Sequence, residues 1–325
     1  MKVIHILFID PLEKLSIQKD GTLLLAHTLS EMGRKVYLLF EDDFYILSNT
    51  PPKVRVFEFT SRLEKSSFHL SSFSLSNEKT LSLGQDVIFH IRLDPPFDGR
   101  YLKYLWMIDF LKNFGVKFFN DPRGILFFNE KISSFLSNSS LPSYIGRSFK
   151  ELLTFTNDLK EQGFTDLMLK PLDLYQGMGI EKVSLEDQSF LKEAFQKKVK
   201  ASHSPVLAQP FLKKIKEGEV RAVFFGKRIL GTILKIPPEG SFLANIAQGA
   251  SCSAIELPEE IAQECSKIGD ALLPYGLYWL AYDILDGHIN EVNVTCPGLL
   301  VEVSCALKRN LALDLVQEME KVVLG

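Results

Sequence analysis

Residues 280 to 298, which read LAYDILDGHINEVNVTCPG, contain two apolar strand-like runs separated by an Asp-Gly pair. An Asp-Gly pair between alternating apolar residues predicts a β-hairpin. Glu291 and Asn293 are two positions apart, so they share one face of the second strand. A strict two-residue turn would aim Asp283 away from Glu291, so we expect a three-residue loop, Asp286 to His288, with a bulge.

The polar side chains of this hairpin carry oxygen donors of the kind that hard divalent cations bind. Mg²⁺ in phosphate chemistry usually takes one or two carboxylates together with the phosphates of the substrate. Asp283, Glu291 and Asn293 are therefore the candidate ligands for Mg²⁺, with Mn²⁺ as the alternative metal. The other interpretation of this segment alone is a solvated hairpin face whose acids bind nothing.

The composition is that of a globular protein. A chain of 325 residues, 46% hydrophobic and 24% charged, can bury large cores and is long enough for two or three small domains. The net charge of −3 gives no basic field, so we do not expect nucleic acid as a partner. No apolar run approaches the roughly 18 residues of a membrane span, and the opening MKVIHILFIDP is interpreted as a strand. The four cysteines lack CxxC spacing, which predicts reduced thiols and a cytoplasmic protein.

Strands and helices alternate in the first third of the chain. An apolar strand is followed by a periodic stretch from Thr22 to Met32, which Gly33 closes, and by a second strand. The same order recurs between residues 85 and 121, which predicts two β-α-β units. The Ser-rich stretch at 66 to 83 has weak periodicity, and we expect a surface excursion there.

The second part of the chain mixes strands and helices in a different order. We expect a helix around Glu130 to Leu136, a strand pair flanking a helix between Tyr144 and Lys170, and then the strands that lead to the hairpin. This order is typical of an α+β module behind an α/β one. The boundary is expected near residues 120 to 124, which gives a Rossmann-like α/β domain at 1–120 and an α+β domain at 121–325.

Phosphate-binding features are present in an unusual form. The patterns GxxxxGK[ST] and GxGxxG are absent from the expected places. Instead Lys170 ends the strand DLMLK, and Gly177 and Gly179 follow in the next loop. A strand-end Lys offers a point charge to phosphate oxygens, and glycines let backbone N–H groups approach an anion. The alternative is an ordinary Lys-Pro turn into a glycine loop.

Other charged residues are weaker signals. Lys131 lies early in a predicted helix, where a Lys is usually solvent-facing. Glu219 and Arg221 share one face at a strand start, and the alternative for them is an exposed ion pair worth little. The six histidines show no metal spacing, but His90 lies close to Arg92 in the string IRLDPPFD and stays a candidate.

Taken in order along the chain, these pieces resemble the ATP-grasp superfamily. The string RLDPPFD, with Arg92 and Asp94, and the string EVNVTCP of the hairpin are long and specific. Together with DPLEKLSIQKDGT, FFNDPRGILFFNEK and LKPLDLYQGMG they are similar to successive motifs of the bacterial glutathione synthetase family, from Asp10 to about Glu302. The resemblance implies a pre-ATP-grasp domain on the substrate side, then an ATP-grasp domain with a lid at about 140–208 and a metal-binding subdomain at about 209–325.

The resemblance also implies a role for each matched position. Lysines, a glycine loop, an adenine linker and a ribose-side acid would hold ATP. The expected nucleotide-binding residues are Lys131, Lys170, Gln176, Gly177, Gly179, Gln209, Phe211, Leu212 and Glu219. The expected catalytic residues are Arg221, Lys235 and Asn245, the substrate-binding residues are Arg92 and Asp94, and the ligands of two Mg²⁺ are Asp283, Glu291 and Asn293.

Enzymes of this family transfer the γ-phosphoryl group of ATP to a carboxylate, and an amine then displaces phosphate. The resemblance therefore implies a ligase that joins glycine to γ-glutamylcysteine, acts on small molecules and assembles as a homo-oligomer. The alternatives are an ATP-grasp ligase for another amino acid or peptide, and a nucleotide-binding paralogue without activity.

Several positions depart from the family pattern. Lys235 stands where the family has Arg, and a Lys cannot donate in bidentate fashion. Leu243 and Val301 replace two further arginines, and Leu174 to Gly177 replace a Gly-Met-Gly-Gly loop. If the match holds, Leu243 and Val301 take positive charge out of the cleft, which weakens recognition of an acidic dipeptide but not of ATP.

Overall fold

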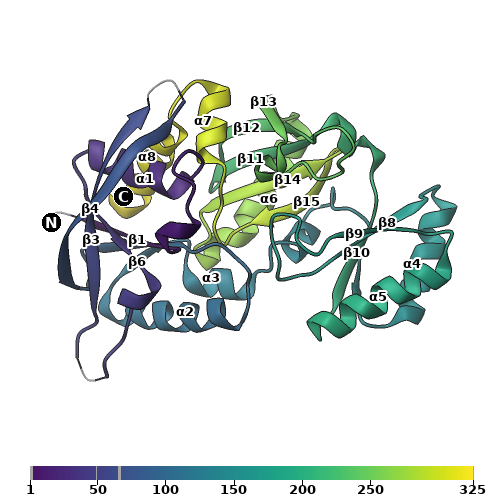
Figure 1. The fold of residues 1–325 in the computed structure, drawn as a ribbon, viewed down its shortest axis with the longest axis horizontal. Helices are drawn as coiled ribbons and strands as arrows, with labels where there is room; N and C mark the ends of the chain where they lie inside the picture. Colours follow the sequence, from purple (N-terminus) through teal and green to yellow (C-terminus); the bar gives the residue numbers. More distant parts are fainter. Residues whose placement is uncertain (1–2, 49, 65–66, 325) are drawn as a thin grey trace.

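The computed structural model describes residues 3–48, 50–64 and 67–324. Figure 1 shows three β-sheets in a row. A six-stranded sheet lies at one end, a five-stranded sheet lies in the middle, and a four-stranded sheet with two helices lies at the other end.

The six-stranded sheet has the order β4-β3-β2-β1-β5-β6. Its parallel strands are β1 (Ile4–Ile9), β2 (Lys35–Leu39), β5 (Val87–Arg92) and β6 (Lys117–Phe119). Helices α1 (Gly21–Glu31) and α2 (Gly99–Phe110) connect them, so both predicted β-α-β units are confirmed. Gly33 and Gly115 have φ of 74° and 80°, as expected for glycines that close helical segments.

The Ser-rich stretch is part of this sheet, so the expectation of a surface excursion is wrong. β3 (Lys53–Glu64) and β4 (His69–Ser82) form a long antiparallel hairpin, and β4 is the edge strand. Apolar side chains such as Phe73 and Leu75 pack against the core, whereas most serines face solvent. The weak periodicity reflects the small polar outer face of an edge strand. Residue 66 lies outside the described residues.

The four-stranded sheet is antiparallel and has the order β7-β10-β8-β9. Its strands are β7 (Tyr144–Gly146), β8 (Asp166–Lys170), β9 (Glu181–Ser184) and β10 (Val206–Pro210). Helices α4 (Phe149–Glu161) and α5 (Gln188–Ser202) cover one face (Figure 1). The expected strand-helix-strand segment is confirmed, although β10 lies between its two strands.

The five-stranded sheet is also antiparallel and has the order β13-β12-β11-β14-β15. Its strands are β11 (Glu219–Phe225), β12 (Arg228–Ile236), β13 (Ser251–Ala254), β14 (Trp279–Leu285) and β15 (His288–Asn293). Helix α6 (Glu259–Leu272) packs on one face through Cys265 and Ile268. α3 (Pro122–Phe127) follows β6, and the helix expected around residue 130 is a 3-10 helix at Ile132–Leu136.

The end of the described chain returns to the first sheet. α7 (Leu300–Leu307) and α8 (Leu311–Leu324) follow the hairpin, and α8 packs against α1. Leu315 and Met319 of α8 share a hydrophobic cluster with Leu23 of α1. No helix among the described residues is long and apolar enough to cross a bilayer. The shared cluster ties the first and middle sheets together.

Candidate active site

A cavity of about 380 Å³ lies where the three sheets meet. It is lined by residues of all three sheets, including Lys170 from the four-stranded sheet, Asp283 from the five-stranded sheet and Arg92 from the six-stranded sheet. Almost every residue that the sequence singled out lines this cavity. Gly179 and Gln209 do not line it.

The hairpin brings Asp283 opposite Glu291, but by a different turn from the one we expected. Leu285 pairs with His288, so the loop has two residues, and the expected three-residue loop is wrong. Asp286 and Gly287 have φ of 52° and 76°, as a type I′ turn requires. The register shifts between Asp283 and Ile284, which leaves Asn290 as the extra residue of a bulge. The bulge therefore sits within the strand.

Asp283 is the centre of a buried ion network. Arg221, its partner across β11 and β14, donates from Nε to Oδ1 at 2.9 Å and from Nη2 to Oδ2 at 2.7 Å. Lys235 donates from Nζ to Asp283 Oδ1 at 2.7 Å and to Glu219 Oε2 at 2.8 Å. Burial opposes ionisation of Asp283, but Arg221 and Lys235 outweigh it and hold the pKa well below its usual range. The interpretation of Glu219 and Arg221 as an exposed ion pair is therefore wrong.

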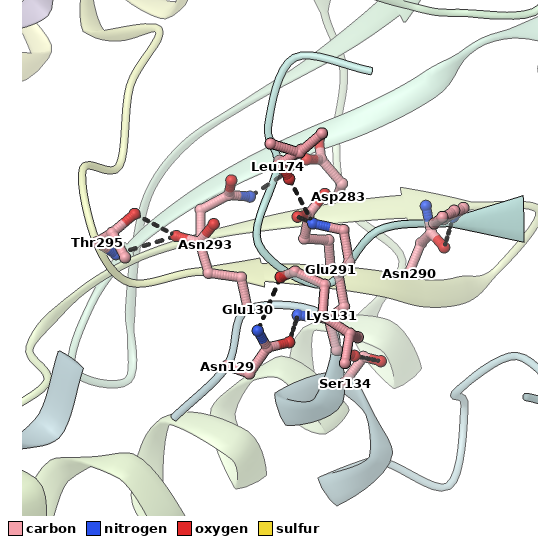
Figure 2. A network of polar contacts seen from close by, with 12 residues as sticks. Asn129, Glu130, Lys131, Ser134, Leu174, Asp283, Asn290, Glu291, Asn293 and Thr295 are labelled. Atoms are coloured by element: carbon pink, nitrogen blue, oxygen red, sulfur yellow. Dashed lines mark hydrogen bonds and ion pairs between the residues drawn. The ribbon is translucent and has the colours of Figure 1, made fainter. Parts of the chain in front are cut away.

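Lys131 and Glu291 form the second ion pair of the site. Lys131 is only 6% exposed, so the solvent-facing interpretation is wrong. Its Nζ lies 3.1 Å from Glu291 Oε1 and donates to the carbonyl oxygen of Leu174 at 2.8 Å (Figure 2). Burial opposes the charge of Lys131, yet the carboxylates of Glu291 and Glu130 raise its pKa. This lysine stays cationic inside the cavity.

Lys170 is held by amide oxygens. Its Nζ donates to Gln209 Oε1 at 2.8 Å and to Asn290 Oδ1 at 3.0 Å. Burial lowers the pKa of Lys170, and Glu291 and Glu219 offset part of that effect. Two neutral acceptors orient the ammonium group without neutralising it, so it can still attract an anion. Gln209 thus contributes to the cavity by positioning Lys170.

The glycine loop approaches the cavity from the four-stranded sheet. Gln176 and Gly177 have φ of 52° and 78°, and both line the cavity. A Cβ on Gly177 would lie 3.0 Å from Leu243 Cδ1. Asn245 donates from Nδ2 to the carbonyl oxygen of Gln176 at 2.8 Å, so it connects this loop to the segment after β12.

One end of the cavity is apolar. Leu212, Leu141 and Leu285 form a small cluster, against which Phe211 and Phe242 pack edge to face with ring centroids 6.2 Å apart. All five line the cavity. Such a slot suits a flat aromatic ring.

Arg92 is buried, so its interpretation as a surface charge is wrong. It is 4% exposed and donates from Nε to Thr22 Oγ1 at 2.9 Å and from Nη2 to the carbonyl oxygen of Pro297 at 3.0 Å. Its guanidinium lies 4.2 Å from the ring centroid of Trp279. Only Nη1 has no partner, which limits what Arg92 can offer a substrate. Asp94, two residues after the end of β5, is open to the cavity.

The two apolar departures from the family pattern lie in different places. Leu243 lines the cavity as expected. Val301 does not, because it packs in the hydrophobic core beside Leu300 and Val303. The expectation that Val301 removes charge from the cleft is therefore wrong, and Glu302, the next residue, lines the cavity instead.

Several polar residues of the site were missed from the sequence. Glu130 accepts from the backbone N–H groups of Val294 and Thr295 at 2.9 and 3.0 Å and from Thr295 Oγ1 at 2.6 Å (Figure 2). It thereby holds the end of the hairpin, and its place directly before Lys131 was the available signal. Asn290 was missed because the bulge was placed in the turn.

The donor set fits a divalent cation. Asp283, Glu291 and Asn293 line one wall of the cavity and offer two carboxylates and an amide oxygen. No cluster of three or more His, Cys, Asp or Glu suited to a metal occurs in the part of the chain that the structure describes, so any metal here would rely on the amide and on a ligand's oxygens. Both carboxylates are already paired with cationic side chains, so a metal would share Glu291 with Lys131 and Asp283 with Arg221 and Lys235.

Two family models match the chain. The prokaryotic glutathione synthetase N-terminal domain matches residues 1–125, and the ATP-grasp domain of the same family matches residues 130–308. The chain belongs to the prokaryotic glutathione synthetase family. It is similar to the glutathione synthetase of Parasynechococcus marenigrum, with 28% identity over 97% of this chain and 98% of that protein. The Coxiella burnetii glutathione synthetase is 25% identical over 89% of this chain and 87% of its own length.

Solved structures agree on the fold. D-cycloserine synthetase DcsG aligns with a TM-score of 0.66 at 14% identity and covers 98% of this chain and 99% of its own. D-alanyl-alanine synthetase A from Vibrio cholerae aligns over both full chains with a TM-score of 0.60 at 14% identity. The ATP-grasp ligase PsnB, in a complex with Mg and ADP, gives 0.61 at 14% identity over 98% of each chain. This member of the glutathione synthetase family therefore has the ATP-grasp fold of an ATP-dependent ligase.

Proposed function

We propose that the chain joins an amino acid to a peptide carboxylate at the expense of ATP, with γ-glutamylcysteine and glycine as the substrates. The observation that supports the proposal most is the cavity itself. Cationic Lys131 and Lys170, an apolar slot and an oxygen-rich wall lie around one space between three sheets. The glutathione synthetases to which the chain is similar suggest the substrate pair.

Each part of the cavity suits one part of this reaction. The apolar slot around Phe211 and Leu212 would hold adenine, and Glu219, which also lines the cavity, would bind the ribose. Lys131, Lys170 and the loop at Gly177 would hold the phosphates. Asp283, Glu291 and Asn293 would hold Mg²⁺, which when bound offsets the charge of the transferred phosphoryl group.

Phosphoryl transfer is stabilised by positively charged groups that are held in fixed positions around the transferred group. The γ-phosphoryl group passes from ATP to the substrate carboxylate, and ADP leaves. The amine of the second substrate then forms the C–N bond, the C–O bond to phosphate breaks, and the amine loses a proton. Asp283 holds Arg221 and Lys235 in place, and their fixed charges would stabilise the transferred phosphoryl group. Asn245 would hold the glycine loop over the phosphates.

A phosphate-release assay tests the proposal. The intact chain with ATP, Mg²⁺, γ-glutamylcysteine and glycine should release phosphate faster than with any one of them omitted. A panel of other peptide and amino-acid pairs serves as the comparison. Faster turnover with a different pair would favour a ligase of other specificity, and no turnover with any pair, despite nucleotide binding, would favour a paralogue without activity.

A further inference from the structure

Besides Asp10 and Glu130, which accept hydrogen bonds from backbone N–H groups, three carboxylates line the cavity outside the proposed nucleotide and metal sites. Asp20 caps the start of α1, Asp94 follows β5, and Glu302 lies in the first turn of α7. Asp20 interacts electrostatically with both of the others. Elements far apart in the sequence therefore bring three acids to one part of the cavity, and we call them the carboxylate cluster.

Glu302 is the least satisfied member of the cluster. It is 9% exposed, and its buried Oε2 has no hydrogen-bond partner. Buried polar atoms are almost always hydrogen-bonded, so an orphan carboxylate oxygen at a cavity wall indicates a donor that arrives with a ligand. Burial also raises the pKa of Glu302, and Lys19 and Arg221 offset part of that effect.

Apart from one N–H group of Arg92, the cationic groups near the cluster are committed elsewhere or exposed. Arg92 donates to Thr22 and Pro297 and stacks on Trp279, which leaves only its Nη1 without a partner. Arg221 is bidentate on Asp283. Lys19 lines the cavity but is exposed to solvent, which screens its charge. Leu243 adds an apolar side chain to the cavity wall where the family pattern has a base. An acidic group would meet more negative than available positive charge here.

We propose that the carboxylate cluster binds the ammonium group of the ligase's peptide substrate. The inference deepens the proposed function and rests on it for the identity of that substrate. An ammonium group has three donors and no acceptor, and three carboxylates can accept them through charge-assisted bonds. Recognition of a γ-glutamyl group would then depend on its α-ammonium group, and its α-carboxylate would contribute little.

Two analogues of γ-glutamylcysteine separate these contributions. γ-Aminobutyryl-cysteine keeps the ammonium group and lacks the α-carboxylate, whereas glutaryl-cysteine keeps the carboxylate and lacks the ammonium group. Calorimetric titration of the full chain with ADP and Mg²⁺ present should give similar Kd values for γ-glutamylcysteine and γ-aminobutyryl-cysteine. Glutaryl-cysteine should bind about 10- to 100-fold more weakly, as expected for loss of a hydrogen bond to a charged group.

Substitutions in the carboxylate cluster test whether these residues bind the ammonium group. Glu302→Gln keeps the shape of the side chain and Asp20→Asn keeps a good N-cap, and each should weaken both amine ligands about tenfold while the Kd of ADP stays unchanged. Glu256→Gln, at an exposed position after β13, is the matched control and should change none of these values. Urea titration of each variant checks that it is folded.

The outcomes are distinct for the two proposals. Tighter binding of glutaryl-cysteine than of γ-aminobutyryl-cysteine overturns the inference, as does absence of binding by all three ligands. The inference is also overturned if Glu302→Gln and Asp20→Asn are both folded and both bind γ-glutamylcysteine and γ-aminobutyryl-cysteine as tightly as the parent chain. Ammonium-selective binding without phosphate release from any substrate pair would leave the inference standing and refute the proposed ligase reaction.

Discussion

Lys235 donates to Glu219 and Asp283 at once and is shielded from solvent. Lys235→Ala leaves the half-buried Glu219 without a hydrogen-bonding cation. It also removes one of the two cations that bind Asp283. Removing one partner of a buried pair typically costs about 3 to 5 kcal/mol because the other charge stays uncompensated. We expect a loss of that order in the free energy of unfolding, measured by urea denaturation.

Lys214→Ala is the control for this prediction. Lys214 pairs with Asp286 at 2.6 Å in the exposed turn of the same hairpin, where solvent screens the charges. Lys214→Ala should therefore leave the free energy of unfolding unchanged. Equal effects of the two substitutions would contradict the view that burial makes the Lys235 network strong.

The sequence predicted cavity residues well where a motif contains them. It predicted them poorly where their position depends on a partner residue from a distant part of the chain. The string EVNVTCP identified Glu291 and Asn293 as cavity residues. The partner of Arg221 could not be predicted, because only the pairing of β11 with β14 puts Asp283 opposite it. Glu302 was missed as a cavity residue because nothing local distinguishes it from Val301, and the direction of α7 decides which of them lines the cavity.

At the scale of elements, β1 and β5 carry a buried histidine pair in the centre of the first sheet. His5 Nδ1 lies 3.0 Å from His90 Nε2, and the rings stack with centroids 5.3 Å apart. Burial, with a smaller effect of Arg34, lowers the pKa of His5 from 6.5 to about 4. Burial also lowers the pKa of His90 well below its ordinary value. Both rings are therefore neutral in the folded protein at pH 7.

This pair predicts a loss of stability in mild acid. Between pH 6.5 and about 4 the unfolded chain binds a proton at His5 that the folded chain does not, so stability falls as pH falls through this window. His5 alone should contribute roughly 2 kcal/mol of loss by pH 5. Urea titrations at pH 7.5 and 5 measure it, and His5→Leu/His90→Leu should show a smaller difference. His203→Asn, at an exposed site, should behave like the parent chain.

Elements themselves were predicted better than their registers. Both parallel units and the hairpin followed from periodicity and glycine positions. The turn did not, because a bulge in the strand and a bulge in the loop give the same facing of Asp283 and Glu291. β4 was missed since an edge strand with a serine-rich outer face lacks the apolar signal on which the strand prediction depends.

At the scale of the whole molecule, the cavity is shared by three sheets, so a ligand that fills it should stabilise the native state. With ADP or an unreactive ATP analogue and Mg²⁺ at about 100 times the Kd, the gain should be roughly 2.7 kcal/mol, seen as a higher Tm. Lys170→Met should reduce this shift and Lys214→Met should preserve it. If neither nucleotide raises the Tm of the parent chain, the proposed nucleotide site is wrong.

The return of α8 to the first sheet has a consequence for how the chain is made. Leu315, Val316 and Met319 cover apolar side chains of α1, so this part of the core is not buried until α8 has left the ribosome. While the other two sheets are being synthesised, apolar side chains of the first 120 residues therefore stay exposed to solvent. Chaperone demand during translation should thus be set by the distance in sequence between α1 and α8.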